Sequence, residues 1–362
     1  MIRVAISIGT LEVGGAENFV VNLLKNLDYS RFSLLLIVLE KPCDSFLEKE
    51  VEKLPIQISY MKKKEGFSIK VIIKVFKTLR KFKPDILHGN IGGLIYFLPF
   101  LVLKKIKMIY TAHTLADKEF GILKQRILKR FLRRKKIIAV GISPEIKKSL
   151  EKVYEINSED IPLIYNGIDV EKFSFNRCYL ENIVIGHVGR FEPVKNHRTI
   201  IEVYQLLKNK YPKISLRLVG DGSLFLKYKE ELKNDLSVVF VGESMNVSEE
   251  LKKIDLFLMP SLYEGLPLSV LEAMASGCVI VASCVGGLKD LIEDEKNGYL
   301  INDSRDVEGF FEVIENLVND RKKLRDISLN NIRKVHNFDI KNTVKEYQEL
   351  YCMEARHVKR GI

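Results

Sequence analysis

The sequence predicts an α/β protein built from two Rossmann-like halves, each with a parallel sheet covered by helices. Short runs of Val, Ile and Leu alternate with helical patterns along most of the chain, as in parallel strands that are buried on both faces. The alternation is interrupted at residues 166–173, where turn-forming residues replace apolar ones, and it then starts again. The length of 362 residues also exceeds what one hydrophobic core usually holds, so two domains are expected.

The first half is expected to contain short strands separated by helices. The strands are expected at residues 4–8, 32–39, 56–60, 85–88, 108–111, 137–140 and 163–165, and the helices at 16–27, 68–82, 121–134 and 144–152. The longest apolar run, residues 91–103, contains Gly92, Gly93 and Pro99 and is shorter than the ~20 residues that span a membrane. We expect this run to form a buried helix.

The second half repeats the pattern. Its strands are expected at residues 183–188, 215–219, 238–241, 256–259 and 279–282, and its helices at 196–209, 223–234, 247–253, 268–276, 306–319 and 322–335. A last helix is expected at about residues 340–356. The domains are therefore predicted at residues 1–172 and 173–339.

The cysteines favour a reducing, cytoplasmic setting. All five lack metal-ligand spacing, and an odd number argues against a complete disulfide framework. The chain starts at once with a strand pattern and shows no secretion signal. The cysteines are Cys43, Cys178, Cys278, Cys284 and Cys352.

The net charge of +11 is concentrated in the first half. Residues 1–176 contain 31 Lys and Arg against 19 Asp and Glu, and residues 62–64 and 125–136 contribute much of this excess. Such a face could attract anionic lipid or an acidic polymer, or it could be the solvated side of an inward-packed helix. Nucleic acid is disfavoured because no recognisable binding motif accompanies the charge.

Glu264 and Glu272 are the most informative residues of the second half. Residues 256–260 predict a strand ended by proline, and Gly265 and Pro267 then break the backbone before a helix. Glu264 is expected in this turn and Glu272 about one turn into the helix, at the sheet edge where ligands bind. Because a carboxylate can accept hydrogen bonds from two hydroxyls, the pair suggests sugar or ribose recognition. The alternative is a solvated loop residue and a helix-dipole effect.

Arg190 and Lys195 follow the first strand of the second half. A guanidinium fork and an ammonium group at one strand end suit a diphosphate, whose negative charge grows as it leaves. Two solvated loop cations are the alternative. Gly220-Asp221-Gly222 and Gly242 also end strands. Each could border a base or ribose or form a tight turn, and Gly242 is favoured for base contact.

Gly14, Gly15 and His113 are the candidate residues of the first half. The two glycines precede a helix and would let backbone approach a phosphate or sugar, or they could form a simple turn. They do not make a Gly-x-Gly-x-x-Gly fingerprint, so no nicotinamide or flavin cofactor is implied. His113 follows a strand and could contact a substrate oxygen or be a hydrogen-bonded loop residue. His88 has the same two interpretations with less support.

Together these residues resemble the retaining glycosyltransferases of family 4, which have two Rossmann-like domains facing across a cleft (the GT-B fold). Glu264 and Glu272 match the Glu-x7-Glu motif of that family. The other matching residues are Gly14 to Glu17, His113, Asn166 to Asp169, Gly189, Arg190, Lys195 and Gly220 to Gly222. The resemblance spans nearly the whole chain in the expected order.

The resemblance implies transfer of a sugar from a nucleoside-diphosphate sugar, with UDP-sugars favoured, to a saccharide or lipid-linked acceptor in cell-surface polysaccharide synthesis. It implies catalytic roles for His113, Arg190, Lys195 and Glu264, and no metal or cofactor beyond the co-substrate. The donor would also be bound by Gly14, Gly15, Gly242, Gly265, Leu266, Pro267, Leu268 and Glu272. The last helix would pack back on the N-terminal, acceptor-binding domain, and residues 173–339 would bind the donor.

The resemblance also implies reaction on one face of the sugar, with the departing phosphate taking the acceptor proton. The basic first half favours a lipid-linked acceptor and peripheral association with the inner face of the cell membrane. Two other functions are open: a nucleotide-sugar 2-epimerase of the same architecture, and a non-catalytic protein that binds sugar nucleotides.

Overall fold

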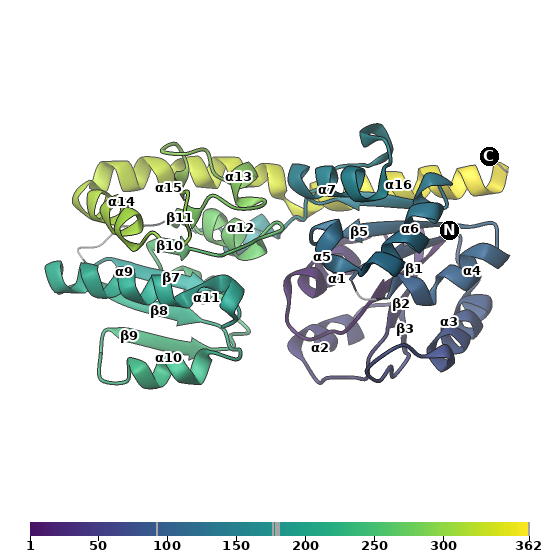
Figure 1. The fold of residues 1–362 in the computed structure, drawn as a ribbon, viewed down its shortest axis with the longest axis horizontal. Coiled ribbons are helices and arrows are strands. Elements are labelled where there is room, and N and C mark those ends of the chain that lie inside the picture. Colours follow the sequence, from purple (N-terminus) through teal and green to yellow (C-terminus); the bar gives the residue numbers. More distant parts are fainter. Residues whose placement is uncertain (92, 176, 178–181, 361–362) are drawn as a thin grey trace. The chain divides into compact units, whose positions relative to one another are not determined.

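A computed structural model describes residues 1–360 apart from 92, 176 and 178–181, with side chains described as far as residue 357. Gly92 and Cys178, both named above, lie outside the described residues. The chain divides into two compact units (Figure 1). The first contains residues 1–167 and the C-terminal helix, and the second contains Ile168–Asp339, so the division lies five residues before the expected boundary.

The first unit is a six-stranded parallel sheet in the order β3-β2-β1-β4-β5-β6. Its strands are β1 (Ile2–Ile8), β2 (Phe32–Val38), β3 (Gln57–Tyr60), β4 (Ile86–Gly89), β5 (Lys107–Ala112) and β6 (Ile137–Gly141). The strand expected at residues 163–165 is wrong, because Leu163 makes only an isolated bridge to Gly141. Pro162 precedes it and cannot donate to a ladder.

Helices connect the strands of the first unit. They are α1 (Gly15–Asn26), α2 (Phe46–Glu52), α3 (Ile69–Phe82), the 3-10 helix η1 (Leu94–Tyr96), α4 (Leu98–Leu103), α5 (Ala116–Glu119), α6 (Ile122–Arg133), α7 (Pro144–Tyr154) and η2 (Ser158–Asp160). The single buried helix expected at residues 91–103 is wrong. Pro99 starts α4 as a separate short helix, and Val102 and Leu103 at its end are 61% and 68% exposed.

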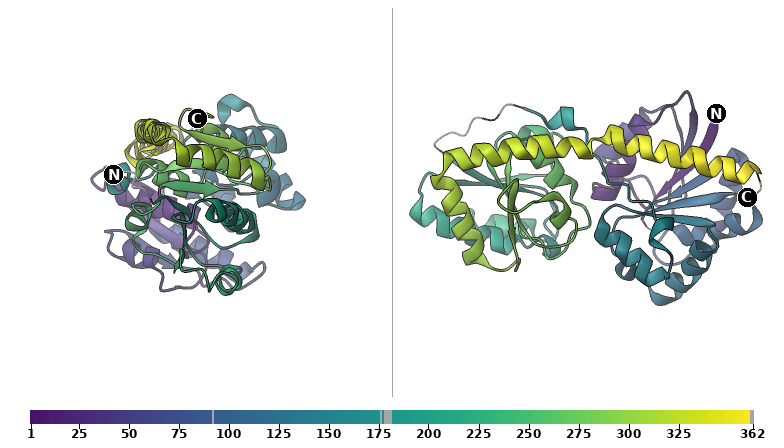
Figure 2. Two further views of the ribbon diagram at one scale, coloured as in Figure 1. Left: turned by 90° about the vertical axis from the view of Figure 1, so that its left-hand side faces the viewer. Right: turned by 90° about the horizontal axis from the view of Figure 1, so that it is seen from above.

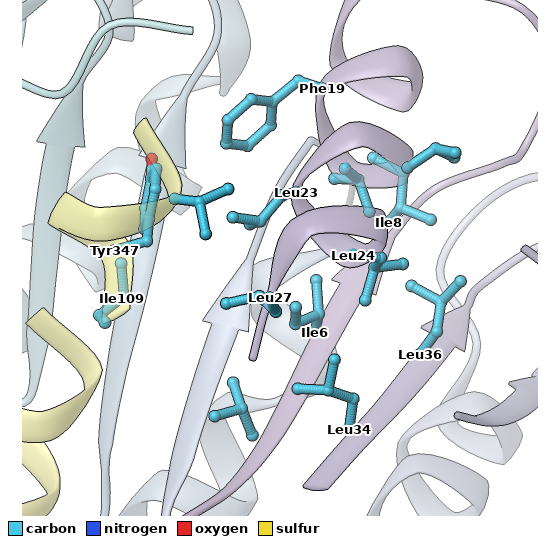
Figure 3. Packing of buried hydrophobic residues seen from close by; sticks show 14 of the residues in the cluster. Ile6, Ile8, Phe19, Leu23, Leu24, Leu27, Leu34, Leu36, Ile109 and Tyr347 are labelled. Atoms are coloured by element: carbon cyan, nitrogen blue, oxygen red, sulfur yellow. The ribbon is translucent and has the colours of Figure 1, made fainter. Parts of the chain in front are cut away.

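The C-terminal helix α16 (Ile340–Arg360) belongs to the first unit and packs against α1, β1, β4 and β5 (Figure 2). Figure 3 shows Tyr347 of α16 in the same core as Phe19 and Leu23 of α1. The His88 ring is fully buried, with Nδ1 2.6 Å from the Tyr351 hydroxyl and Nε2 2.8 Å from the Thr111 hydroxyl. His88 therefore helps to hold α16 on the sheet.

The second unit is also a six-stranded parallel sheet, in the order β12-β11-β10-β7-β8-β9. Its strands are β7 (Val184–Val188), β8 (Ser215–Val219), β9 (Val238–Gly242), β10 (Leu256–Met259), β11 (Val279–Ser283) and β12 (Gly298–Ile301). The strand β12 was not expected from the sequence, because its four residues follow a charged segment and start at a glycine.

Helices cover this sheet as well, and α9 packs against α14. They are α8 (Val170–Phe173), η3 (Pro193–Lys195), α9 (His197–Lys210), α10 (Phe225–Glu231), α11 (Val247–Leu251), α12 (Leu268–Ala275), α13 (Leu288–Leu291), α14 (Val307–Asn319), α15 (Arg321–Val335) and η4 (His336–Phe338).

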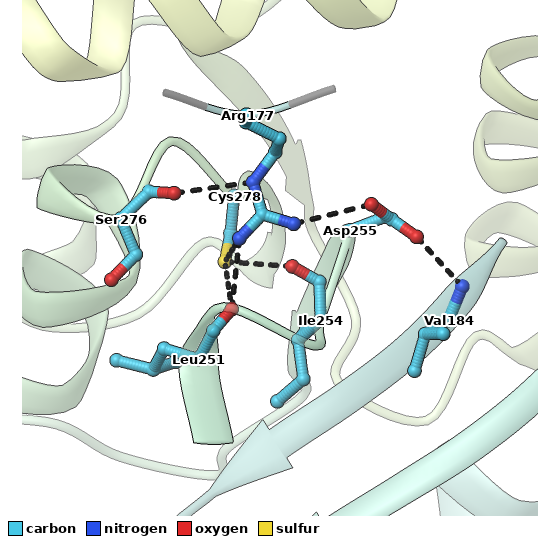
Figure 4. A network of polar contacts seen from close by, with 7 residues as sticks. All are labelled: Arg177, Val184, Leu251, Ile254, Asp255, Ser276 and Cys278. Carbon is cyan, nitrogen blue, oxygen red and sulfur yellow. Dashed lines mark hydrogen bonds and ion pairs between the residues drawn. The ribbon is translucent and has the colours of Figure 1, made fainter. Parts of the chain in front are cut away.

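A buried arginine joins the start of the second unit to its sheet (Figure 4). Arg177 donates to the carbonyls of Ser276 and Leu251, at 3.1 and 2.8 Å, and its guanidinium lies 3.1 Å from the Asp255 carboxylate. Asp255 in turn accepts from the backbone N–H of Val184, the first residue of β7. Only 4% of the Arg177 side chain is exposed, so this ion pair is largely desolvated.

Candidate active site

The turn between β10 and α12 carries a buried ion pair. Lys195 Nζ lies 2.6 Å from Glu264 Oε1, and 18% and 10% of the two side chains are exposed. Lys195 comes from η3, which follows β7, and β7 and β10 are neighbours in the sheet. The sequence placed both residues at strand ends but did not predict their pairing, because 69 positions separate them. Arg190, on the loop between β7 and η3, is exposed.

Backbone bonds fix the two loops that carry this pair. The N–H of Leu262 donates to the carbonyl of Val194 at 2.8 Å. Asn196, with a left-handed φ of 52°, sends its side-chain amide to the carbonyls of Pro260 and Ser304 at 3.1 and 2.7 Å. Sequence reasoning did not single out Asn196. A Lys-Asn-His sequence before a helix could have indicated a cap, but its long-range partners could not be predicted.

Gly286 and Gly287 pack closely against the backbone of the turn at residues 264–265. A Cβ on Gly286 would stand 1.7 Å from the Glu264 carbonyl oxygen, and one on Gly287 would stand 2.1 Å from that of Gly265. The φ of 52° at Gly286 also favours glycine. The N–H of Gly287 donates to the Gly265 carbonyl at 2.9 Å. This close approach sets the path of residues 264–268, and sequence reasoning did not identify it.

Glu272 lies one turn into α12, as expected. Burial raises the pKa of its carboxyl from 4.5 to about 7, and the charge of Lys172 on the neighbouring α8 acts in the opposite direction. The N-terminus of α12 carries no side-chain cap, so its first N–H groups are not occupied by a cap residue. The carboxyl of Glu272 and a helix N-terminus without a side-chain cap thus belong to one helix, which follows the turn that carries Glu264.

The glycines that end other strands have two different structural roles. Gly220 and Gly222 have positive φ, and a Cβ on either would stand under 3.0 Å from the backbone of Gly189 or Phe191. These two glycines therefore allow neighbouring loops to pack, which favours the tight-turn interpretation. Gly242 also has a positive φ, but a Cβ there would meet nothing within 4 Å. The space beside Gly242 is open.

In the first unit, His113 lies between two amide side chains. Its Nε2 is 3.0 Å from Asn90 Oδ1, and its Nδ1 is 3.4 Å from Asn166 Nδ2. Burial lowers the pKa of His113 from 6.5 to about 3, so the ring is neutral near pH 7. These contacts fit a tautomer in which Nε2–H donates to Asn90 and Nδ1 accepts from Asn166. The ring is thus held in one orientation at the end of β5.

Gly14 and Gly15 lie at the start of α1, after the loop that follows β1. A Cβ on Gly14 would stand 2.3 Å from Glu17 Oε2, whereas one on Gly15 would meet nothing within 4 Å. Gly14, the residue before the helix, has an extended backbone, and no side chain caps the N-terminus of α1. Gly15 is therefore the open position where another molecule can approach the helix N-terminus.

The chain matches two models of known protein families. Residues 13–172 match a model described as Glycosyltransferase Family 4, and residues 170–334 match one described as Glycosyl transferases group 1. The chain belongs to the family 4 glycosyltransferases. Together the two matches cover both units, and they contain every candidate site residue named above. The enzyme is therefore a glycosyltransferase with the GT-B fold.

Characterised relatives and solved structures agree with this assignment. The glycosyltransferase is 27% identical to the UDP-Gal:alpha-D-GlcNAc-diphosphoundecaprenol alpha-1,3-galactosyltransferase of Escherichia coli over 78% of this chain and 79% of that one. It is 28% identical to the capsular polysaccharide biosynthesis glycosyltransferase CapH of Staphylococcus aureus, over 85% and 87% of the two chains. Anabaena HepE, solved with UDP and glucose, has the same fold, with a TM-score of 0.81 at 19% identity over 97% and 99% of the two chains.

The matches give no support to the epimerase alternative. The roles of individual residues in the glycosyltransferase remain predictions from the sequence and from the geometry above.

Proposed function

We propose that the enzyme transfers a sugar from a UDP-sugar to a lipid-linked saccharide, with retention at the anomeric carbon and without a metal ion. The Lys195 and Glu264 pair carries this proposal. A buried cation 2.6 Å from a carboxylate offers a partner for a diphosphate and an acceptor for sugar hydroxyls in one place. A relative named as a UDP-Gal-dependent galactosyltransferase, and a structural neighbour solved with UDP, support the choice of nucleotide.

The donor would be held by groups from several loops. Arg190 and Lys195 would bind the diphosphate, and the ionised Glu272 would accept from the ribose hydroxyls. Glu264 and the N–H groups of residues 265–268 would contact the sugar, and the open space at Gly242 would take the base. Gly14 and Gly15 would let the first unit approach the donor. The diphosphate would share Lys195 with Glu264.

Transfer would take place on one face of the sugar. The bond from the anomeric carbon to the phosphate oxygen breaks, and the acceptor oxygen bonds to the same carbon from the same side. The acceptor proton moves to the departing phosphate oxygen, while Arg190 and Lys195 stabilise the charge left on the diphosphate. His113 would position the sugar as a neutral ring. Its hydrogen-bonding partners are two amides, which cannot act as the nucleophile of a covalent mechanism.

A thermal-shift screen over UDP, ADP, GDP, CDP and TDP tests the donor half of the proposal. A ligand that binds the folded protein at 100 times its dissociation constant adds about 2.7 kcal/mol of stability. UDP is expected to raise the melting temperature most. A larger shift with another diphosphate would change the donor, and no shift with any of them would contradict the donor site.

Metal independence has its own test. Positive charge from Arg190 and Lys195 can replace a divalent cation at the diphosphate, so UDP release should persist in excess EDTA. Loss of activity in EDTA that added Mg²⁺ or Mn²⁺ restores would contradict this part of the proposal.

We also propose that the enzyme works at the cytoplasmic face of the cell membrane. None of the described helices is both long and apolar enough to cross a bilayer. The exposed apolar residues Ile122 and Leu123, 71% and 73% exposed, start the basic helix α6. Apolar and cationic side chains on one helix suit a surface of anionic lipid.

Sedimentation with liposomes tests this membrane proposal. Liposomes that contain anionic lipid should carry the protein down at low salt, and neutral liposomes should not. Absence of binding to anionic liposomes at low salt would contradict membrane association without affecting the donor site.

A further inference from the structure

The first unit contains a pocket of about 410 Å³ at the carboxyl edge of its sheet. Its walls follow β3, β4 and β5, and the helix α6 completes them. This volume lies within the ~300–1,000 Å³ typical of small-molecule sites. Ile91, which lines the pocket, directly follows Asn90, the partner of His113. The pocket therefore starts one residue from the candidate site of the first unit.

Most of the lining is apolar. The aromatic rings of Phe67 and Tyr96 are stacked with centroids 5.8 Å apart, and Phe67 is 62% exposed. The apolar side chains of the wall are those of Phe67, Ile91, Leu94, Ile95, Tyr96, Leu98, Phe120, Ile127 and Leu128. A saccharide alone would leave its hydroxyls without partners against such a wall, whereas a hydrocarbon chain loses nothing by contact with it.

The charged groups of the lining are Lys63, Lys124 and Glu119. Burial raises the pKa of Glu119 to about 7, and its carboxylate accepts a hydrogen bond from the Tyr110 hydroxyl. Much of the carboxyl charge is thus suppressed near neutral pH, and the other two charged side chains of the lining are lysines. Lys124 also belongs to the basic helix α6. An apolar wall with two cations suits an amphiphile whose head group is anionic.

We propose that this pocket binds the hydrocarbon chain of a phosphorylated lipid, with the phosphate held by Lys63 and Lys124. The inference rests on the proposed function in one respect: the lipid would be the carrier of the acceptor sugar. The phosphate and the chain are both required. The phosphate uses the lysines, and the chain uses the apolar walls.

The absence of tryptophan from the chain allows a direct binding assay. Phe67→Trp puts a single fluorophore at the exposed rim of the pocket. Octyl, decyl and dodecyl phosphate, each below its micelle concentration, are the probes, and inorganic phosphate and dodecyl maltoside are the controls. Each buried methylene contributes about 0.8 kcal/mol, so saturable binding should strengthen about fourfold per added methylene. The two controls should bind far more weakly than dodecyl phosphate.

Paired variants in the Phe67→Trp background locate the binding. Lys124→Gln should weaken dodecyl phosphate about tenfold, because a hydrogen bond to a charged group is lost. Arg126→Gln, on the same helix but outside the lining, should change binding less than about twofold. Ile127→Asp in the wall should abolish binding, whereas Ile122→Asp at an exposed position should leave it intact. Circular dichroism checks that each variant is folded.

Three results would overturn the proposal. They are equal losses in Lys124→Gln and Arg126→Gln, affinity that does not depend on chain length, and binding of inorganic phosphate as strong as that of dodecyl phosphate. Titration with UDP separates this outcome from failure of the proposed function. UDP binding without dodecyl phosphate binding rejects the pocket alone, and the reverse result rejects the UDP donor while the lipid site stands.

Discussion

At the scale of single residues, the donor site depends on charges whose value changes during the reaction. Negative charge on the diphosphate grows only as the bond to the sugar breaks, so Lys195 should matter more to turnover than to binding. Lys195→Ala is expected to lower kcat by about 100-fold or more, with a much smaller change in UDP affinity. Glu272→Ala should mainly weaken donor binding. Kinetics together with calorimetric titration of UDP checks this split.

Lys233→Ala is the control for that pair of variants. Its ammonium forms an exposed contact with Glu230 in the same unit, so both kcat and UDP affinity should be unchanged. If Lys195→Ala and Glu272→Ala both lost only donor affinity, and to the same extent, the assignment of Lys195 to the departing diphosphate would be wrong.

Ionisation of the buried Glu272 lowers the free energy of unfolding, so its effect depends on pH. Because its pKa is raised from 4.5 to about 7, the folded protein holds a proton that the unfolded chain loses between these values. Ionised Glu272 therefore destabilises the free protein above about pH 7 and has no such effect below about pH 4.5. Glu272→Gln should raise stability at pH 8 by up to about 3 kcal/mol and by less than about 1 kcal/mol at pH 5.

Thermal melts at both pH values, with and without UDP, measure this effect. The variant should melt higher than the wild type at pH 8 and should gain less from UDP. An equal change in melting temperature at pH 5 and pH 8 would show that the gain has another cause.

The sequence predicted where these residues lie but not what they contact. Glu264 and Glu272 were placed correctly because a proline-ended strand and a helix start are local patterns. The pairing of Lys195 with Glu264 and the contacts of Asn196 join segments that are distant in the chain. No local pattern encodes such contacts, so they become visible only in the fold.

At the scale of elements, the turn of residues 264–268 keeps its path because Gly286 lacks a side chain. A methyl group there would stand 1.7 Å from the Glu264 carbonyl oxygen at a φ of 52°, so the turn must move. Gly286→Ala should lower stability by about 1–3 kcal/mol and reduce turnover with it. Thermal melts and UDP-release assays provide the two readouts.

Gly121→Ala is the matched control for this variant. A Cβ at Gly121 would meet nothing within 4 Å, and its φ of −64° suits any residue. Stability and activity should both be retained. If Gly286→Ala behaved like Gly121→Ala, the turn would not depend on this close approach.

The Arg177 network is expected to hold the second unit together (Figure 4). Removing the guanidinium leaves the largely buried Asp255 carboxylate without this cation, which typically costs about 3–5 kcal/mol. Urea unfolding of Arg177→Ala should show this loss. A loss below about 1 kcal/mol, the value of an exposed pair, would contradict the buried role.

The elements that the sequence missed share a physical cause. The helices α2 and α5 have seven and four residues, too few for a clear period, and β12 has four residues next to a charged segment. Residues 91–103 looked like one helix because composition alone suggested burial. Gly93 directly precedes η1 and Pro99 lies in the first turn of α4, so the run forms two short helices. Strands made of continuous apolar residues and long amphipathic helices were predicted well, because each has a clear pattern in the local sequence.

At the scale of the whole molecule, the two units have similar sheets but different charge. The excess of basic residues lies in the first half, which also contains the apolar pocket and the exposed start of α6. The second half is nearly neutral and contains the Lys195 and Glu264 pair. We therefore assign the acceptor and the membrane surface to the first unit and the donor to the second.

This assignment predicts that added salt weakens liposome binding by the first unit more than it changes UDP release by the second. Raising the salt concentration from about 0.05 to 0.5 M shortens the Debye length and should release the enzyme from anionic liposomes. UDP release in solution should change much less, because Lys195 and Glu264 are largely buried. Parallel losses of liposome binding and of UDP release would contradict the separation.

Proton NMR of donor turnover distinguishes retention, inversion and epimerisation in one experiment. The enzyme is incubated in EDTA with UDP-glucose, UDP-galactose or UDP-N-acetylglucosamine, and spectra are recorded before the released sugar mutarotates. We expect slow release of UDP from one donor, with the sugar appearing first as the α-anomer that the donor contains. First appearance of the β-anomer would contradict retention, and conversion of the donor to an epimer without release of UDP would contradict glycosyl transfer itself.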